Sequence, residues 1–265
     1  MTIISDLLLK NNSKCALVPF ITAGYPNLES TANALYTLDM HGADIIELGI
    51  PYAYALADGP IIQESSRVAL DQGVNFDQII DMLKSVVPNL DVPIVLFTYY
   101  NPVLVRGIEN FIIDSAISGV SGLVIPDLPL EEADFLIELC KKYKIELILF
   151  VAPTSSQARI SSIISKSPGC IYLVSSCGVT GIRNEINFQI NNLAIQIKKD
   201  TKKAIILGFG ISDQNQAAQV SKWNIDGVVI GSAFIKVMFN KTPDEAVRSL
   251  GFFCQSIRDA IDKDS

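Results

Sequence analysis

Short apolar, β-branched runs alternate along the chain with stretches whose apolar residues recur at helical spacing. We predict strands at 16–22, 44–48, 94–99, 122–125, 146–151, 170–175, 203–209 and 226–231. Because these runs are apolar on both faces, they are typical of a parallel sheet covered by helices. Eight strand–helix units in a chain of this length favour a closed (β/α)8 TIM barrel. An open dinucleotide-binding sheet is disfavoured, because the turn after the first strand, TAGYPN, lacks GxGxxG.

Two features add to the barrel pattern. The first twelve residues carry Asp6 and Lys10 among apolar residues without a small-residue cleavage site, so we predict an N-terminal helix and no secretory signal. The longest interval, between the second and third strands, predicts two helices, 61–73 and 76–87, and therefore an extra helix. No linker, low-complexity segment or charge run interrupts residues 1–265, which predicts a single domain.

The composition describes an acidic chain with ample material for one large core. Of the 265 residues, 49% are hydrophobic and 18% are charged, against about 25% charged in an average globular protein, which excludes intrinsic disorder. The 28 acidic and 21 basic residues give a net charge of −7, which leaves no basic footprint for nucleic acid or an anionic membrane. No uncharged run approaches the roughly 18 residues of a membrane span, so we expect a soluble protein.

The cysteines and the histidine limit metal and nucleophilic chemistry. His41 is the only histidine, no CxxC or Cys/His metal spacing occurs, and the five scattered cysteines are Cys15, Cys140, Cys170, Cys177 and Cys254. We therefore expect a reducing compartment, no metal site and no histidine-based triad. His41 precedes Gly42 at the end of a helical stretch, where a cation meets the negative helix end, so we predict a structural role for it.

In the second strand, Glu47 lies on the face opposite to Ile46 and Leu48, because successive side chains alternate. The outer face of a barrel strand packs on helices, so Glu47 is predicted to point into the barrel near the carboxyl end, where barrel enzymes carry their active sites. Burying a carboxylate there is costly unless it is paired or protonated. We predict a functional role for Glu47; the alternative is a solvated or salt-bridged glutamate at the strand mouth.

A second carboxylate, Asp58, lies on the loop after this strand, directly before Gly59 and Pro60. An aspartate in that position is often only a turn or helix-cap residue. Its place on the loop that follows Glu47, however, predicts that both side chains lie over the same barrel mouth. Two carboxylates in different surroundings can divide into an acid/base and an electrostatic stabiliser.

Three further polar side chains lie in or near strand ends. Asp127, between prolines after the fourth strand, is predicted as a turn and N-cap residue for the helix that begins near Glu131 and Glu132, in preference to a catalytic residue. Tyr99, at the end of the third strand, and Tyr172, in the sixth, can each offer a hydroxyl group. Barrel packing explains Tyr172 equally well.

Glycine-rich loops follow the last three predicted strands, at 175–185, 208–212 and 230–234. Such loops after strands seven and eight, followed by a helix start, are the usual phosphate site of a barrel. Ser232 adds a hydroxyl at that helix N-terminus. The loop after the sixth strand, with Gly178, Thr180 and Gly181, has the hinge and polar content of a lid.

Taken in order, these motifs resemble the tryptophan synthase alpha chain family. The matching stretches are VPFITAGYP (18–26), IELGIPY and LADGPIIQ around the two carboxylates, IPDLP (125–129), YLVSSCGVTG (172–181), GFGIS and GSAF. The resemblance implies a lyase that cleaves indole-3-glycerol phosphate by a retro-aldol reaction to indole and glyceraldehyde 3-phosphate, without a cofactor in this subunit. It also implies an α2β2 tetramer with a pyridoxal-phosphate beta chain, which receives the indole through a tunnel.

The resemblance further implies a role for each matching residue. Glu47 is the general acid/base, Asp58 holds the indole N–H, and Thr180 is the lid residue that closes onto the aspartate. The implied phosphate contacts are Gly181, Gly210, Gly231 and Ser232. The implied contacts to the indole ring are Phe20, Tyr172 and Phe209.

The chemistry of the two carboxylates fits this assignment. Cleavage at indole C3 requires protonation of that carbon, and a glutamic acid whose pKa is raised by desolvation can deliver the proton. The positive charge that develops on the ring nitrogen needs a fixed anion, which Asp58 can supply. The glycerol hydroxyl must also lose a proton, to Glu47 or to a water molecule.

One segment departs from the family pattern. Where the family usually has Ser-Asp-Pro, this chain has Ala53, Tyr54 and Ala55, on the loop that contacts the beta chain in the family. Loss of the proline raises the entropy cost of placing Asp58. We expect retained lyase chemistry and altered activation between subunits.

Alternative functions remain open on the sequence. A stand-alone lyase would release free indole, and a catalytically weak alpha-like chain would mainly activate a beta chain, although Glu47, Asp58 and Thr180 are all present. A generic phosphosugar isomerase would share the phosphate loops but would not need the two carboxylates. We expect a cytoplasmic protein, or one in the plastid stroma if its gene is organellar.

Overall fold

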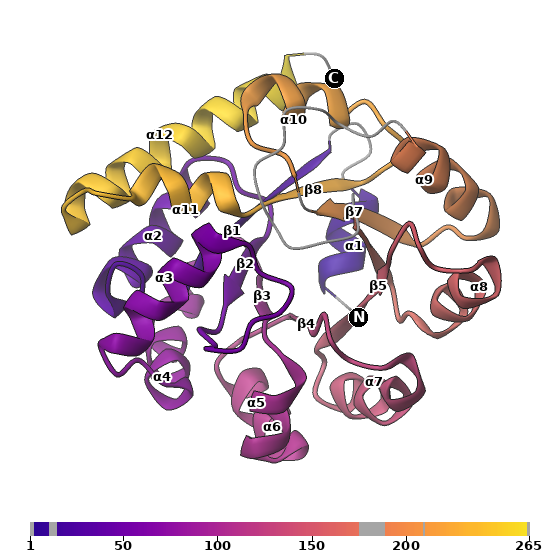
Figure 1. The fold of residues 1–265 in the computed structure, drawn as a ribbon, viewed down its shortest axis with the longest axis horizontal. Helices are drawn as coiled ribbons and strands as arrows, with labels where there is room; N and C mark the ends of the chain where they lie inside the picture. Colours follow the sequence, from indigo (N-terminus) through magenta and orange to yellow (C-terminus); the bar gives the residue numbers. More distant parts are fainter. Residues whose placement is uncertain (1–2, 11–14, 175–188, 209, 264–265) are drawn as a thin grey trace.

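The computed structural model describes residues 3–10, 15–174, 189–208 and 210–263, and their strands form a closed barrel (Figure 1). All eight strands are parallel, each pairs with its neighbours in sequence, and the last pairs with the first. They are β1 (Ala16–Thr22), β2 (Ile46–Gly49), β3 (Ile94–Phe97), β4 (Gly122–Val124), β5 (Glu146–Val151), β6 (Cys170–Val174), β7 (Ala204–Gly208) and β8 (Gly227–Ile230). The predicted (β/α)8 fold and all eight strands are confirmed, with bounds that shift by at most two residues.

The helices surround the strands as an outer ring (Figure 1). Their bounds are α2 (Leu28–Met40), α3 (Pro60–Asp71), α4 (Phe76–Val86), α5 (Tyr100–Arg106), α6 (Ile108–Ile117), α7 (Ala133–Lys142), α8 (Gln157–Lys166), α9 (Gln189–Asp200), α10 (Gln214–Val220), α11 (Ser232–Met238) and α12 (Pro243–Asp262). The predicted pair of helices between β2 and β3 is confirmed as α3 and α4. The helix start predicted at Ser232 is confirmed as the beginning of α11, whereas the short helix α5 was not predicted.

Helix α4 illustrates how local sequence fixes an element. The Asn75 side chain accepts a hydrogen bond from the Gln78 backbone N–H, and the Gln78 side chain accepts one from the Asn75 N–H, both at 3.1 Å. This capping box satisfies two N–H groups that the first turn leaves without partners. The apolar face of the helix, spaced at three and four residues, is buried at Ile79, Ile80, Leu83 and Val86.

The predicted N-terminal helix is confirmed as α1 (Ile3–Lys10), which closes the amino-terminal end of the barrel behind the strands in Figure 1. Ile4 is fully buried and faces the start of β4 at Gly122. The Ser5 backbone N–H donates to Glu146, the first residue of β5, at 3.0 Å. The opposite, carboxyl-terminal end of the barrel is therefore the end that can open to a ligand.

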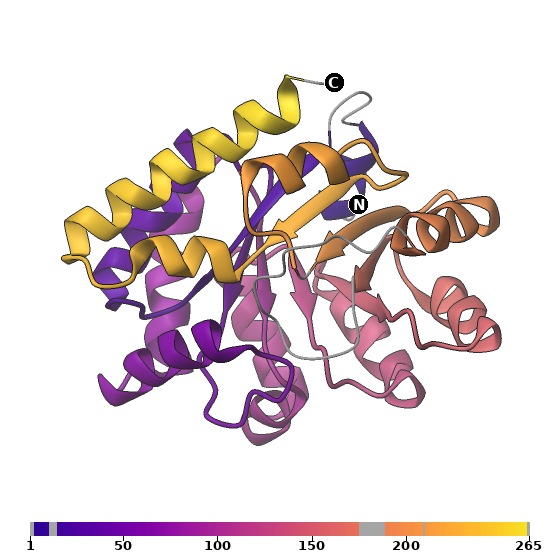
Figure 2. The same cartoon turned by 45° about the horizontal axis from the view of Figure 1, so that its top comes forward.

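Two aspartates tie the amino-terminal ends of neighbouring strands to the outer helices. Asp44 Oδ2 accepts the Leu17 backbone N–H of β1 at 2.7 Å and lies 2.9 Å from the guanidinium of Arg258 on α12. Asp226 Oδ2 likewise accepts the Ile205 N–H of β7 and pairs with Lys198 of α9. Helix α12 runs along the outside, packed on α2, α10 and α11, so the Arg258 contact joins this helix to the barrel (Figure 2).

The cysteine and histidine predictions are tested over the described residues. His41 follows the last turn of α2 and its ring Nδ1 lies 2.7 Å from the Thr37 carbonyl oxygen, so its role is structural there. The thiols of Cys15, Cys140, Cys170 and Cys254 are buried and unlinked, while Cys177 lies outside the described residues. No described group of three or more His, Cys, Asp or Glu side chains is arranged to hold a metal ion. None of the helices in the described part is long and apolar enough to cross a membrane.

Replacing Asp44 with alanine should destabilise the barrel. The substitution leaves the Leu17 N–H without its acceptor and removes one carboxylate from a nearly buried arginine, which together should lower the free energy of unfolding by about 2 kcal/mol. Urea unfolding measures the change. The control is Asp81→Ala, which breaks an exposed pair with Lys84 on α4 and should cost less than about 0.5 kcal/mol. Equal effects of the two substitutions would contradict a role for Asp44 in strand anchoring.

Candidate active site

A cavity opens at the carboxyl-terminal end of the barrel, the end predicted to carry the site. Its walls come from β1, β2, β3, β6 and β8, from the loops after β2, β7 and β8, and from the helices α3 and α11. The lining residues are Phe20, Glu47, Asp58, Ile62, Phe97, Tyr172, Gly210, Ile211, Val229, Gly231 and Ser232. The two carboxylates singled out in the sequence therefore share one cavity.

The strand register places Glu47 inside the barrel. Glu47 pairs with Phe20 of β1 and with Val95 of β3, and its side chain is 2% exposed. The hydroxyl of Tyr172, which is also inside the barrel, donates a hydrogen bond to this carboxyl. Burial, and then the nearby charge of Asp58, raise the pKa of Glu47 to about 8, although the Tyr172 hydrogen bond opposes the shift. Glu47 is therefore mostly protonated at neutral pH.

Asp58 reaches the cavity from the loop between β2 and α3 and is 5% exposed. Gly59, not Asp58, occupies the N-cap position of α3, so the helix-cap alternative does not apply. Burial raises the pKa of Asp58 to about 6, against a hydrogen bond from the Tyr99 hydroxyl that lowers it. The second carboxylate oxygen, Oδ1, is buried and has no hydrogen-bond partner among the described residues.

The environments of the two carboxylates separate their ionisation. With pKa values of about 8 and about 6, the site at neutral pH holds one protonated carboxyl, Glu47, and one carboxylate anion, Asp58. A carboxylic acid beside an anion, in a cavity with apolar walls, can donate a proton to a substrate and stabilise the positive charge that results.

Aromatic rings form the walls around these groups, and two glycines leave room for them. Phe20 and Phe97 meet edge to face with their ring centroids 5.6 Å apart. A Cβ atom at Gly49 would lie 2.5 Å from the Phe20 ring, and one at Gly208 would lie 2.3 Å from the Tyr172 ring and hydroxyl. Any side chain at either glycine would therefore displace a ring that lines the cavity.

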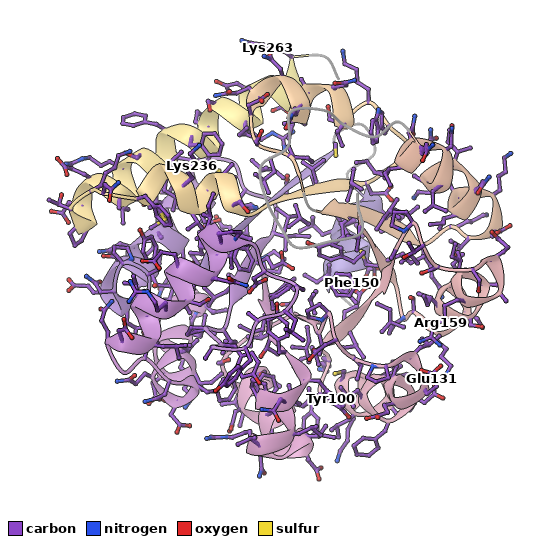
Figure 3. The ribbon with its side chains drawn as sticks, in the orientation of Figure 1. Tyr100, Glu131, Phe150, Arg159, Lys236 and Lys263 are labelled. Carbon is purple, nitrogen blue, oxygen red and sulfur yellow. The ribbon has the colours of Figure 1, made fainter. Side chains whose placement is uncertain are left out.

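Phe150 extends the aromatic wall on β5. It lies toward the centre of the ring of strands in Figure 3, and its ring centroid is 4.6 Å from that of Tyr172. At the outer edge of the same figure, Glu131 and Arg159 form an ion pair that joins the segment after β4 to α8. Phe150 thus supports the cavity wall, while the ion pair lies at the periphery.

Three of the four predicted phosphate contacts lie in the described part of the chain. Gly210, Gly231 and Ser232 line the cavity, Gly210 with a positive φ of 89° that favours glycine, and Ser232 is the first residue of α11. Thr180, Gly181 and Phe209 lie outside the described residues, so their roles stay predictions.

Sequence reasoning missed Phe97, Ile62, Ile211 and Val229, all of which line the cavity. Phe97 lies two residues after Val95, the strand partner of Glu47, so the alternation of β3 would have indicated its inward direction. Ile62 comes from α3 and Ile211 from the loop after β7. Their positions depend on the paths of those segments, for which the sequence carries no comparable signal.

Asp127 is a helix-capping residue, as predicted, but it caps a different helix from the one predicted. Asp127 Oδ1 accepts the backbone N–H of Tyr100, the first residue of α5, at 2.8 Å. It therefore caps the helix after β3, whereas the segment that follows Asp127 begins with Pro129 in the cap position. The reason is spatial: β3 and β4 are neighbours in the barrel, so their carboxyl ends and following loops meet.

Comparison with known sequences gives consistent matches over nearly the whole chain. The sequence profile described as "Tryptophan synthase alpha chain" matches residues 7–262. Proteins named tryptophan synthase alpha chain are 57% identical in Gracilaria tenuistipitata var. liui (98% of this chain and 97% of that protein) and 48% identical in Arabidopsis thaliana (96% and 92%).

Solved structures agree with the sequence matches. Tryptophan synthase subunit alpha from Legionella pneumophila superposes with a TM-score of 0.88 at 31% identity, covering 99% of each chain. A chain of the structure described as the tryptophan synthase α2β2 complex of Pyrococcus furiosus superposes with a TM-score of 0.84 at 33% identity, covering 92% of this chain and 98% of that chain.

Substituting Glu47 with glutamine should change how stability depends on pH. The ordinary pKa of this carboxyl is 4.5 and its folded value is about 8, so between these values folding takes up a proton and stability falls as pH rises, by up to about 1.4 kcal/mol per pH unit. The contribution is fully present below pH 4.5 and is lost as pH passes 8. Glutamine cannot ionise, so E47Q should gain stability relative to the wild-type protein between pH 5 and 8.

Urea unfolding of both proteins across this pH range measures the difference. Glu138→Gln, on the exposed face of α7, is the matched control and should follow the wild-type curve. A constant difference between E47Q and wild type at every pH would contradict the raised pKa.

Proposed function

The chain belongs to the tryptophan synthase alpha chain family, whose members are enzyme subunits, and we propose that it cleaves indole-3-glycerol phosphate to indole and glyceraldehyde 3-phosphate. The observation that carries the proposal is that Glu47 and Asp58 are both buried in one aromatic-walled cavity, where burial raises their pKa values to about 8 and about 6. The buried Oδ1 of Asp58, which has no hydrogen-bond partner within the described part of the chain, suits an N–H donor on the substrate.

In the proposed first step, the Glu47 carboxyl donates its proton to C3 of the indole ring. The ring becomes an indolenine cation, and Asp58 accepts a hydrogen bond from the ring N–H and stabilises the positive charge. In the second step, the hydroxyl on the carbon attached to C3 returns a proton to the Glu47 carboxylate, directly or through water. The bond from C3 to that carbon breaks, its electron pair restores the aromatic ring, and the carbon becomes the aldehyde of the second product.

The phosphate end of the substrate is proposed to lie against Gly210, Gly231 and Ser232, across the cavity mouth. Glycine lets backbone N–H groups approach phosphate oxygens closely, and the Ser232 hydroxyl adds a donor. Phe20 and Tyr172 are proposed to contact the indole ring. The roles of Thr180 as a lid residue, Gly181 as a phosphate contact and Phe209 as an indole contact belong to the same proposal.

We further propose that the chain works with a beta chain in an α2β2 tetramer. The similar structure from Pyrococcus furiosus is that of a tryptophan synthase α2β2 complex. The indole would then pass to the partner and would not be released. A stand-alone lyase is the competing function, favoured only by the Ala53-Tyr54-Ala55 departure on the loop before Asp58. We also propose a location in the cytoplasm or the plastid stroma. The similar proteins come from organisms that include Gracilaria tenuistipitata and Trichodesmium erythraeum.

Indole release from indole-3-glycerol phosphate, with and without an added beta chain, tests the function. We expect cleavage that increases with the beta chain, and a loss of roughly 10²–10⁴-fold in E47Q with nearly unchanged substrate binding, because glutamine keeps the shape but carries no acidic proton. Strong activity that a beta chain does not change would favour the stand-alone lyase. Full activity of E47Q would exclude Glu47 as the acid, and the exposed Glu138→Gln variant serves as the control.

The dependence of kcat/KM on pH should be bell-shaped. Activity requires an ionised Asp58, so it should fall below about pH 6, and it requires a protonated Glu47, so it should fall above about pH 8. Steady-state kinetics between pH 5 and 9.5 give both limbs. A rate that keeps rising above pH 9 would contradict the assignment of Glu47 as an acid.

A further inference from the structure

The loop that carries Asp58 is held by contacts from outside the cavity. Its backbone forms a turn in which the Asp58 N–H donates to the Ala55 carbonyl at 3.2 Å. The side-chain amide of Gln63, on α3, donates to the carbonyls of Ala55 and Asp58 at 3.4 and 2.9 Å. These bonds fix the backbone of the loop, but none of them reaches the Asp58 carboxylate.

Tyr99 makes the contact that does reach it. Its hydroxyl accepts the Ala57 backbone N–H at 3.1 Å and donates its own hydrogen to the Asp58 carboxylate. Burial raises the pKa of the Tyr99 phenol above its usual value of 10, so the phenol keeps the hydrogen that it donates. One hydroxyl group thereby fixes both the backbone before Asp58 and one side of its carboxylate.

The Tyr99 ring is itself fixed on two sides. Its ring centroid lies 6.1 Å from that of Phe97, which lines the cavity, and 5.4 Å from that of Tyr52, at the start of the loop. The amide of Asn101, on α5, donates to the Tyr52 hydroxyl at 3.2 Å. Tyr99 is 3% exposed but does not line the cavity, so it is placed to act on Asp58 and not on a substrate.

The other titratable groups beside Asp58 and Tyr99 come from three further parts of the barrel. Glu47 and the Tyr172 hydroxyl come from β2 and β6, and Asp127 interacts with Tyr99 from the loop after β4. Glu47 and Asp127 are carboxyl groups and the phenols are neutral, so none of these groups brings a positive charge to Asp58. The hydrogen bond from Tyr99 favours the ionised form of Asp58 against burial, and the Oδ1 atom has no hydrogen-bond partner among the described residues.

We propose that Tyr99 is the positioning residue for Asp58: its hydroxyl holds one carboxylate oxygen so that the other oxygen is available to the ring N–H of the substrate. The proposal rests on the proposed lyase function. The loop is thereby held by Tyr99, which follows β3, and by Gln63 of α3.

Tyr99→Phe tests the proposal, because it removes the hydroxyl and keeps the ring between Phe97 and Tyr52. We expect kcat/KM to fall roughly 10- to 100-fold and its acidic limb to move to higher pH, since the ionised form of Asp58 loses a hydrogen bond. The matched control is Tyr100→Phe at the next residue, whose side chain lies away from the cavity with its hydroxyl bonded to Glu132 (Figure 3). The control should keep both the wild-type rate and the wild-type limb.

The outcomes separate this proposal from the function on which it rests. An active wild-type protein whose Tyr99→Phe variant keeps the same acidic limb would overturn the positioning role, even if the rate fell through a loss of stability. An inactive wild-type protein, with and without a beta chain, would instead overturn the proposed function. In that case a 13C NMR titration of the Asp58 carboxyl in both proteins still decides the contact: a higher pKa in the variant supports it, and equal values exclude it.

Discussion

Closure of the sheet is the constraint on which the rest of the structure depends. Because β8 pairs with β1, every second side chain of each strand enters one shared interior, whatever its chemistry. Glu47 occupies such a position, so its carboxyl is removed from water by the same geometry that buries Phe20 and Val95 beside it. Helix α1 closes the amino-terminal end. The interior is consequently accessible from the carboxyl-terminal end, where the cavity lies.

The burial of Glu47 carries an energetic cost, because the interior of the barrel disfavours its ionised form. A neutral apolar side chain would fill the position without the loss of stability that ionisation brings as pH rises. The same burial keeps the carboxyl protonated near neutrality, which an exposed glutamate does not achieve. Asp58 is buried beside it, yet its contact with Tyr99 holds its pKa closer to the ordinary range. Glu47 also accepts a tyrosine hydrogen bond, so the two pKa values differ because Glu47 is more completely buried and the nearby charge of Asp58 raises its pKa further.

The sequence predicted the features that follow from strand periodicity. All eight strands, the inward direction of Glu47 and the pair of helices before β3 depend on patterns within a few consecutive residues, and each agrees with the structure. The unpredicted helix α5 has seven residues, too few for a helical period to stand out. Asp127 and Phe97 depend on which strands are neighbours. The cap that Asp127 provides lies 27 residues earlier in the chain, beyond any local pattern.

The loop before Asp58 shows that the arrangement of the candidate site depends on contacts that no sequence motif contains. The residues that match the family, Glu47 and Asp58, could be identified from sequence, but the group that orients the aspartate lies 42 residues beyond the loop residue it binds. Ring contacts continue from Phe97 in the cavity wall through Tyr99 and Tyr52 to Tyr54, which is 74% exposed. Packed rings therefore run from the cavity wall near Asp58 to the molecular surface at Tyr54, within the segment 53–55.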